Sequence, residues 1–210
     1  MIRNHTLAHF TITAILCILA SDVRATPLFS ATSETKSTDI SAFTKWTSTL
    51  TRHPHHFEQL TAQCITHKNC KKQDWEDQLQ TLKTKSTIQQ IKGINHYINQ
   101  APYVKDIVNW GMEDYWETLF EFFTRNGDCE DYAIAKYLSL KKLGFDTANL
   151  RIVVLNDDNL GVLHSVLAVY EGSDVYILDN QIKTVLKDTR IHHYTPIYSI
   201  NETAWWRHLP

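Results

Sequence analysis

Three side chains in this 210-residue chain have the types that nucleophilic catalysis uses. Cys129 comes directly after Gly127 and Asp128, a turn after which we expect a helix to begin. The free N–H groups and the dipole of a helix start favour a thiolate and offer donors to a developing oxyanion. A thiol nucleophile also needs a base within hydrogen-bond reach and a third group that orients this base. His164 and Asp179 are the side chains that we expect in these two roles.

The spacing of His164 and Asp179 is compatible with a contact across a β-hairpin. Residues 171–174 read as a turn between two apolar runs, which predicts two strands joined by a short loop. If Tyr170 pairs with Val175, His164 lies diagonally beside Asp179 on one face of the sheet. A loop of odd length would reverse the parity and separate the two side chains.

Each of the three residues also has a structural interpretation when it is taken alone. A cysteine at a helix start is commonly a small buried residue, a histidine in a strand is commonly structural, and Asp179 followed by Asn180 is compatible with a simple turn. Their order along one chain, together with the cysteine count, favours catalysis.

The cysteine count predicts an exported protein with one unpaired thiol. Residues 1–25 have a weakly basic start, an apolar run and a small residue at the end, which is typical of a cleaved signal peptide. The run is shorter than the ~20 apolar residues that span a bilayer. Cleavage removes Cys17 and leaves three cysteines in an oxidising compartment. Cys64 and Cys70 are close enough to close a short loop, so we expect them to form a disulfide and Cys129 to stay free.

The overall composition is that of one globular domain. A hydrophobic content of 43% and a charged content of 21% exclude long disorder and fibrous repeats. The net charge of −2 provides no basic field for nucleic acid. Residues 26–40 are rich in Ser and Thr, and we expect a flexible lead-in there, followed by a single domain over residues 41–210.

Helical patterns come first in this domain and strand patterns follow. Apolar residues at three-to-four spacing predict helices between residues 42 and 110. Another helix is predicted after Gly127, with Asp128 as its cap and Gly144 at its end. Beyond it, short apolar runs predict strands over residues 150–155, 164–170 and 175–178. Helices followed by antiparallel strands indicate an α+β fold rather than an alternating α/β fold.

Residues 116–143 resemble the signature of a known family. The string Gly127-Asp128-Cys129-Glu130-Asp131-Tyr132-Ala133 is similar to the motif of the bacterial transglutaminase-like cysteine peptidases, the LapG-type periplasmic proteases. Segments that follow in the family's order are 150–154, 164–167, 178–180 and 198–201. Leu119 and Ser165 depart from the family pattern, which has a Pro and an Ala there, and both positions are peripheral to the chemistry.

The resemblance implies a papain-like or transglutaminase-like core in which Cys129, His164 and Asp179 form the catalytic triad. It also implies calcium-dependent proteolysis of a large cell-surface adhesin, near the N-terminus of the adhesin, in the periplasm. Such cleavage releases cells from a biofilm. In that family an inner-membrane receptor for cyclic di-GMP captures the protease and holds it off its substrate, so the periplasmic domain of such a receptor is an expected partner.

Three carboxylates surround the predicted nucleophile: Asp128, Glu130 and Asp131. One interpretation is that they only cap and charge the first helical turn, each contributing about 0.3–1 kcal/mol. Unshielded, however, they would raise the pKa of Cys129 and oppose the thiolate. A bound calcium ion, which prefers oxygen ligands, would neutralise them. We therefore expect Asp128 and Glu130 to be calcium ligands, and Asp131 to be either a third ligand or only a cap.

The backbone N–H of Cys129 is one expected donor to the oxyanion. An indole N–H from Trp110 or Trp116 is a candidate for the second donor, with packing in the core as the alternative for both. Two other functions stay open at this point. A transglutaminase uses the same triad for acyl transfer, and an exported binding module would keep the fold without the activity.

Overall fold

The computed structural model describes residues 28–29, 31–66 and 71–209. The predicted signal peptide over residues 1–25 lies outside these residues. Cys70 and the side chain of Cys64 also lie outside them, so the disulfide stays a prediction. Within the described part of the chain, no helix is long and apolar enough to cross a membrane.

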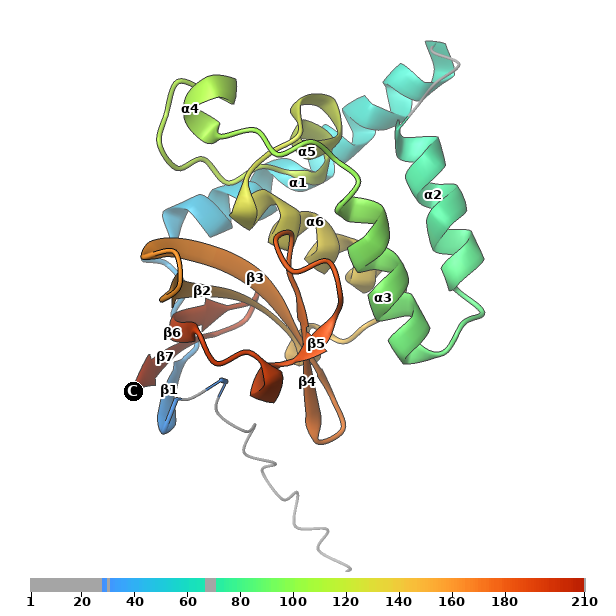
Figure 1. Cartoon of the computed structure of the whole chain (residues 1–210). Coiled ribbons are helices and arrows are strands. Elements are labelled where there is room, and N and C mark those ends of the chain that lie inside the picture. Colours follow the sequence, from blue (N-terminus) through green and yellow to red (C-terminus); the bar gives the residue numbers. More distant parts are fainter. Residues whose placement is uncertain (1–27, 30, 67–70, 210) are drawn as a thin grey trace, which may run out of the picture.

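The helices precede all strands but one, as Figure 1 shows. The helical pattern between residues 42 and 110 corresponds to four helices, and the helix predicted after Gly127 is α6. Pro54 lies inside the first helix. The bounds are α1 (Thr44–Thr66), α2 (Lys71–Leu82), α3 (Thr87–Ile98), α4 (Asp106–Asn109), α5 (Leu119–Arg125) and α6 (Cys129–Lys142), with short 3-10 turns at Thr147–Asn149 and Asp188–Arg190.

The strands form one seven-stranded antiparallel sheet with the order β1-β7-β6-β2-β3-β4-β5. The three predicted strands correspond to β2, β3 and β4, and the α+β class is confirmed. The bounds are β1 (Ser33–Ser37), β2 (Leu150–Asp157), β3 (Val162–Glu171), β4 (Asp174–Leu178), β5 (Leu186–Lys187), β6 (Tyr194–Ile200) and β7 (Trp205–Leu209).

The flexible lead-in that we expected over residues 26–40 is wrong for its central part. Residues 33–37 form strand β1, which pairs with β7 at the edge of the sheet. Arg151 of β2 binds Glu34 at 2.9 Å and stacks 3.6 Å from the ring of Trp206. A polar, Ser-rich segment is therefore ordered by a distant partner strand and a buried ion pair, which a local composition argument does not capture.

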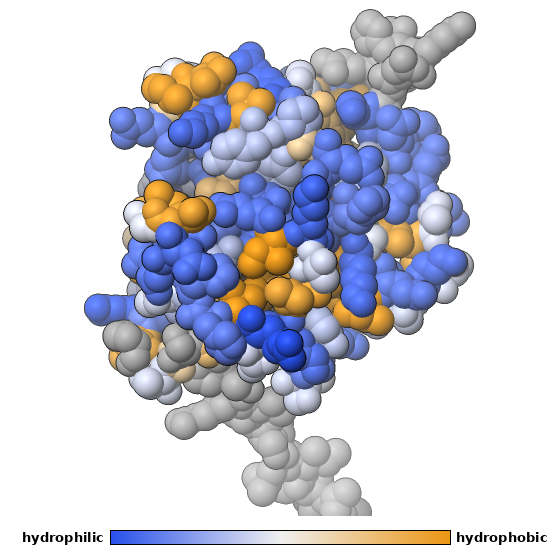
Figure 2. All heavy atoms as spheres, in the orientation of Figure 1, coloured by the Kyte–Doolittle hydropathy of each residue, from blue (hydrophilic) through white to orange (hydrophobic). Residues whose placement is uncertain are grey.

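Helix α6 is the centre of the molecule. It packs against β2 and β3 on one side and against α3 and α5 on the other, and its side chains from Glu130 to Leu140 are buried. A helix that is buried on every face belongs to a core between layers. A second apolar cluster, which includes Val166, Ile177 and Tyr194, forms a core separate from the α6 core. The face in Figure 2 is mostly hydrophilic, with separate apolar patches.

Candidate active site

Cys129 is the first residue of α6, and residues of the preceding turn position it there. Asp128 is the N-cap, with an extended backbone (φ −109°, ψ −156°). The Asp131 carboxylate accepts the Asp128 N–H at 3.0 Å and the Glu117 N–H at 2.8 Å. A Cβ atom at Gly127 would collide with the Asp131 carboxylate. The Gly-Asp-Cys turn is therefore shaped by the space that Asp131 needs.

The Cys129 thiol is partly buried beside carboxylates. Its Sγ donates a hydrogen bond to Glu130 Oε2 at 3.1 Å. Burial raises the pKa of the thiol well above its usual value, and Glu130 and Asp128 raise it further. The backbone N–H of Ser165, the neighbour of His164, hydrogen-bonds to the sulfur and acts in the opposite direction. Without a counter-charge near the carboxylates, the sulfur stays protonated.

His164 lies on β3, and Asp179 directly follows β4. The two strands pair with Tyr170 opposite Val175, which is the register expected from the turn. The pairing brings His164 Nε2 to 2.9 Å from Asp179 Oδ1, and both residues are only 1% exposed. The contact expected between the two side chains is present.

Further hydrogen bonds hold the Asp179 carboxylate and its backbone. Oδ1 also accepts the Gln181 N–H at 2.8 Å, Oδ2 accepts the Tyr194 hydroxyl at 2.6 Å, and Asn99 Nδ2 donates to the Asp179 carbonyl at 2.7 Å. Burial acts to raise the pKa of Asp179, but the hydrogen bond and charge of His164 and the other two carboxylate donors outweigh it and lower the pKa. Asp179 is therefore an anion at neutral pH.

The His164–Asp179 hydrogen bond determines which ring nitrogen can act as a base. Because Nε2 faces the carboxylate of Asp179, it carries the proton of the neutral ring, and Nδ1 is the acceptor. The side-chain amide nitrogen of Gln181 lies 3.4 Å from Nδ1. The second nitrogen thus faces a polar group that a substrate or the thiol can displace, since Gln181 is exposed.

Six carboxylate residues gather around the start of α6, where we predicted three. They form overlapping groups of three ligand residues, and within each group the ligand atoms lie within 4.8 Å of one another. The Cys129 sulfur belongs to one of these groups. We call the six acids the acid cluster: Asp106, Asp114, Glu117, Asp128, Glu130 and Asp131.

Four members of the acid cluster have raised pKa values. Burial is the largest cause for each of these four, followed by neighbouring carboxylates or by partly opposing hydrogen bonds. The pKa is raised to about 9 for Glu130, to about 8 for Glu117 and to about 6 for Asp106. The pKa of Asp131 is also raised well above its usual value. Buried carboxylates this close together need a cation or protons.

Three oxygens of the acid cluster have no donor. Asp106 Oδ1, Glu117 Oε2 and Asp128 Oδ1 are buried without a hydrogen-bond partner among the described residues. Unpaired carboxylate oxygens with no nitrogen ligand suit a hard cation such as calcium. The residues present therefore fit the calcium ion that the sequence analysis predicts.

Half of the acid cluster was not predicted from the sequence. Asp106, Asp114 and Glu117 lie in the segment before α5, and no local pattern marks them as ligands. Only the fold brings this segment to the start of α6: the Asp106 N–H, for example, donates to Asp128 Oδ2 at 3.3 Å. Acidic residues within an aromatic-rich stretch were the available signal, and alone it was not specific.

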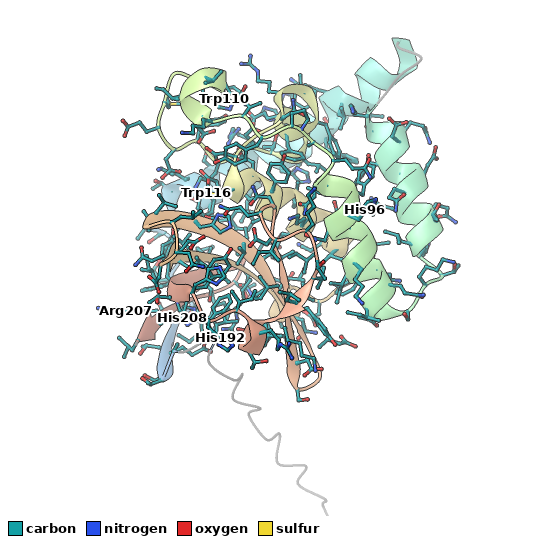
Figure 3. The ribbon with its side chains drawn as sticks, viewed as in Figure 1. His96, Trp110, Trp116, His192, Arg207 and His208 are labelled. Atoms are coloured by element: carbon teal, nitrogen blue, oxygen red, sulfur yellow. The ribbon has the colours of Figure 1, made fainter. Side chains whose placement is uncertain are left out.

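The two tryptophans proposed as oxyanion donors, Trp110 and Trp116, are labelled in Figure 3, and both have other hydrogen-bond partners. The indole N–H of Trp110 donates to Glu117 Oε1 at 2.7 Å, and that of Trp116 donates to Asp114 Oδ1 at 3.0 Å. Both indoles thus stabilise carboxylates of the acid cluster, and neither is free to serve an oxyanion in this arrangement. The Cys129 N–H stays the one donor that we assign.

Known proteins resemble this chain in sequence and in fold. A family model described as bacterial transglutaminase-like cysteine proteinase matches residues 47–210. No curated protein sequence matches the chain. Among solved structures, LapG of Legionella pneumophila is 29% identical over 71% of this chain and 86% of that chain, with a TM-score of 0.63. Its calcium-bound form has a TM-score of 0.64 at the same identity and coverage, and its EGTA-treated form has a TM-score of 0.63.

The matched region contains the described active-site residues and the whole acid cluster. A helix-start cysteine, a buried His–Asp pair and a transglutaminase-like α+β fold occur together within it. The chain belongs to the bacterial transglutaminase-like cysteine proteinases.

Proposed function

We propose that the chain is a calcium-dependent cysteine endopeptidase in which Cys129 is the nucleophile, His164 the base and Asp179 the group that orients the base. The observation that carries the proposal is the buried 2.9 Å hydrogen bond between His164 and Asp179, next to a cysteine at a helix start. The contact between the Cys129 sulfur and Ser165 supports it, because Ser165 adjoins His164 on β3.

The proposed mechanism follows from the hydrogen-bond pattern. Nδ1 of His164 takes the Cys129 proton, and the thiolate attacks the peptide carbonyl carbon. The Cys129 N–H, at the start of α6, stabilises the oxyanion. The imidazolium returns its proton to the leaving amine, which leaves a thioester on Cys129. His164 then deprotonates a water molecule that hydrolyses the thioester.

The acid cluster is the proposed calcium site, with Asp128 and Glu130 as the central ligands and Asp106 and Glu117 as further candidates. A bound calcium ion supplies positive charge that neutralises these carboxylates. Glu130 hydrogen-bonds the thiol in the described state, so its engagement elsewhere would release Cys129 for ionisation. The calcium-bound form of Legionella pneumophila LapG supports the choice of metal.

The proposed substrate is a large cell-surface adhesin, cleaved near its N-terminus in the periplasm, with release of biofilm cells as the consequence. This proposal rests on the family resemblance of the Gly127–Ala133 string and on the signal-peptide pattern of residues 1–25. Cell fractionation and N-terminal sequencing test the location, and we expect a mature chain that begins at Thr26.

The proposed inhibitory partner is the periplasmic domain of an inner-membrane cyclic di-GMP receptor. It rests on the same resemblance. Titration of the purified protease with such a domain tests it, and we expect adhesin cleavage to fall as the complex forms. Unchanged cleavage at saturating receptor domain would remove this partner from the proposal.

The decisive experiment incubates candidate adhesin fragments with the wild-type protein and with Cys129→Ser, each with calcium and with a chelator. We expect cleavage by the wild-type protein with calcium alone. Cleavage by Cys129→Ser would contradict the assignment of the nucleophile. Full cleavage in chelator would contradict the calcium requirement while leaving the nucleophile in place.

Two controls separate the remaining functions. An added primary amine tests acyl transfer, since a transglutaminase would join the amine to the acyl group that water otherwise takes. A thiol-reactive probe tests the non-catalytic binding module. We expect the probe to label Cys129, and labelling to fall in His164→Ala.

A further inference from the structure

Tyr194, the first residue of β6, contacts two residues of the proposed triad. Its hydroxyl donates to Asp179 Oδ2 at 2.6 Å, and its ring lies edge-on to the His164 imidazole, with centroids 5.8 Å apart at 60°. The side chain is 1% exposed and belongs to the apolar cluster separate from the α6 core. It is therefore held rigidly against the Asp–His pair by a strand that carries none of the three triad residues.

The two carboxylate oxygens of Asp179 accept hydrogen bonds from different donors. Oδ1 accepts from His164 and from the Gln181 N–H, whereas Oδ2 has the Tyr194 hydroxyl as its donor. A carboxylate rotates about its last torsion unless both oxygens are held, because this torsion has a broad energy well. The Tyr194 hydroxyl is thus the contact that keeps Oδ1 turned toward His164.

We propose that Tyr194 is a positioning residue of the proposed active site, which acts on the base through Asp179. A catalytic role for Tyr194 rests on the proposed function. The contacts of Tyr194 with Asp179 and His164 do not depend on any substrate. Tyr194 orients the carboxylate and shares its negative charge through a buried hydrogen bond. The proposed array of nucleophile, base and orienting carboxylate thereby gains a fourth member on β6.

The charge shared with Tyr194 has a measurable consequence at His164. Without the hydroxyl, the carboxylate of Asp179 loses the donor that holds Oδ2 and shares its charge, so its hydrogen bond to Nε2 of His164 changes. Other ionisable groups whose charges act here are Lys136 on α6, which acts on Asp179, and Cys129 on α6 and Asp157 on β2, which act on Tyr194. Their contribution is the same in both variants of the comparison below.

The test compares Tyr194→Phe with Tyr170→Phe. Tyr170 is a matched control, because its hydroxyl is buried without a hydrogen-bond partner among the described residues and touches no triad residue. We expect kcat to fall about tenfold or more in Tyr194→Phe, in line with the loss of a hydrogen bond to a charged group. KM should stay within about twofold, since the Tyr194 side chain is only 1% exposed. Tyr170→Phe should keep wild-type kcat.

A second measurement does not depend on proteolysis. In a calcium-loaded Cys129→Ala background, NMR of labelled histidine follows the Nε2–H signal of His164, which reports its hydrogen bond to Asp179, with His164→Gln identifying the signal. We expect Tyr194→Phe to move this signal and Tyr170→Phe to leave it in place. An unchanged His164 Nε2–H signal in Tyr194→Phe would overturn the inference, whether or not the protein proves to be a protease.

A double-mutant cycle separates positioning from general packing. In the Asp179→Asn background, Tyr194→Phe should cause no further loss of kcat, because the carboxylate through which it acts is gone. A full additional tenfold loss in that background would overturn the inference. It would show that Tyr194 affects the site without Asp179.

Discussion

The His164–Asp179–Tyr194 array and the acid cluster both contain buried carboxylates, but these are stabilised in different ways. Each oxygen of Asp179 accepts at least one hydrogen bond from within the chain. In the acid cluster, Asp106, Glu117 and Asp128 each leave one oxygen without a donor among the described residues. Accordingly, the pKa of Asp179 is lowered, whereas the pKa of Glu117 is raised to about 8.

This difference separates two ways of preparing a catalytic group. The proposed base is held by hydrogen bonds from within the chain, so His164 and Asp179 are already arranged without a ligand. The proposed nucleophile lacks such support, because burial and the carboxylates of Glu130 and Asp128 raise the pKa of Cys129. Under the proposed mechanism, calcium therefore controls the nucleophile and not the base.

The largest expected effect is the loss of activity in Asp179→Asn. The substitution keeps the shape of the side chain but removes the charge that orients and stabilises the imidazolium, so we expect kcat to fall by roughly 10²–10⁴. Calcium affinity, measured by calorimetry, should stay unchanged because Asp179 lies outside the acid cluster. A parallel loss of calcium affinity would show that the two regions are not independent.

Calcium should stabilise the folded protein. A ligand at a hundred times its Kd adds about 2.7 kcal/mol to the free energy of unfolding. We expect thermal unfolding to shift to higher temperature on calcium addition in wild type and in Asp179→Asn, and to stay in place in the Asp128→Asn, Glu130→Gln double variant. Equal midpoints for wild type with calcium and with chelator would contradict the acid cluster as a calcium site.

The pH dependence of stability should differ between metal-free and calcium-loaded protein. The pKa of Glu117 is raised from 4.5 to about 8 by burial, so the unfolded chain releases this proton before the folded chain does. The free energy of unfolding of chelated protein should then fall as pH rises from about 4.5 to about 8. Glu117→Gln should flatten this fall, whereas the exposed control Glu58→Gln should not. An identical slope in Glu117→Gln and wild type would contradict the prediction.

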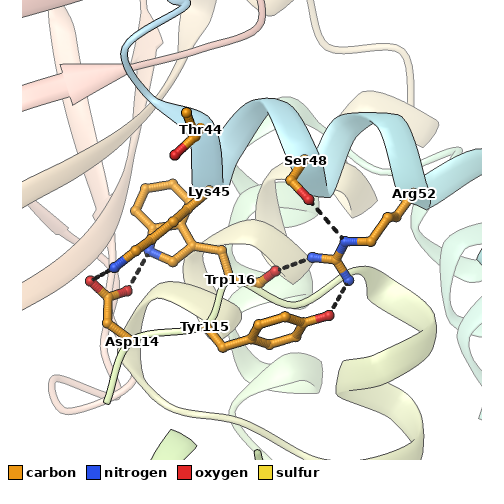
Figure 4. Close-up of a pocket in the computed structure, with 7 residues that line it drawn as sticks. All are labelled: Thr44, Lys45, Ser48, Arg52, Asp114, Tyr115 and Trp116. Atoms are coloured by element: carbon orange, nitrogen blue, oxygen red, sulfur yellow. Dashed lines mark hydrogen bonds and ion pairs between the residues drawn. The ribbon is translucent and has the colours of Figure 1, made fainter. Parts of the chain in front are cut away.

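The smallest expected effect concerns Lys45, which forms an ion pair with Asp114 at the rim of the acid cluster (Figure 4). Both side chains are about half exposed (49% and 51%), so solvent screens the pair. We expect Lys45→Met to change the free energy of unfolding by less than about 1 kcal/mol. A change as large as that caused by chelation would mean that the fold supplies its own counter-charge.

The parts of the molecule that could be predicted from sequence are those set by local rules. Turn chemistry and hydrophobic period were enough to predict the start of α6 and the pairing of Tyr170 with Val175, and with it the approach of His164 to Asp179. These features depend on residues that are close in sequence. The number of residues in the hairpin loop determines which face of the sheet His164 and Asp179 occupy.

The parts that could not be predicted depend on contacts between distant segments. The acids before α5 reach α6 only through tertiary packing, so Asp106 and Glu117 carried no mark in the sequence. The indoles of Trp110 and Trp116 were interpreted as oxyanion donors because their carboxylate partners were not known to be near. The hydrophobic periodicity of a sequence predicts which side chains are buried. It does not predict which polar side chains from distant segments form hydrogen bonds.

The pairing of β1 with β7 has a consequence for the order in which the sheet can be assembled. The strand partners of residues 33–37 are residues 205–209, so β1 cannot dock until almost the entire chain is available. Until then the outer edge of β7 has no neighbour, and an unpaired edge is a site for association with other chains. Loss of residues 33–37 would leave that edge of β7 open, whereas loss of residues 205–209 would expose the edge of β6 instead.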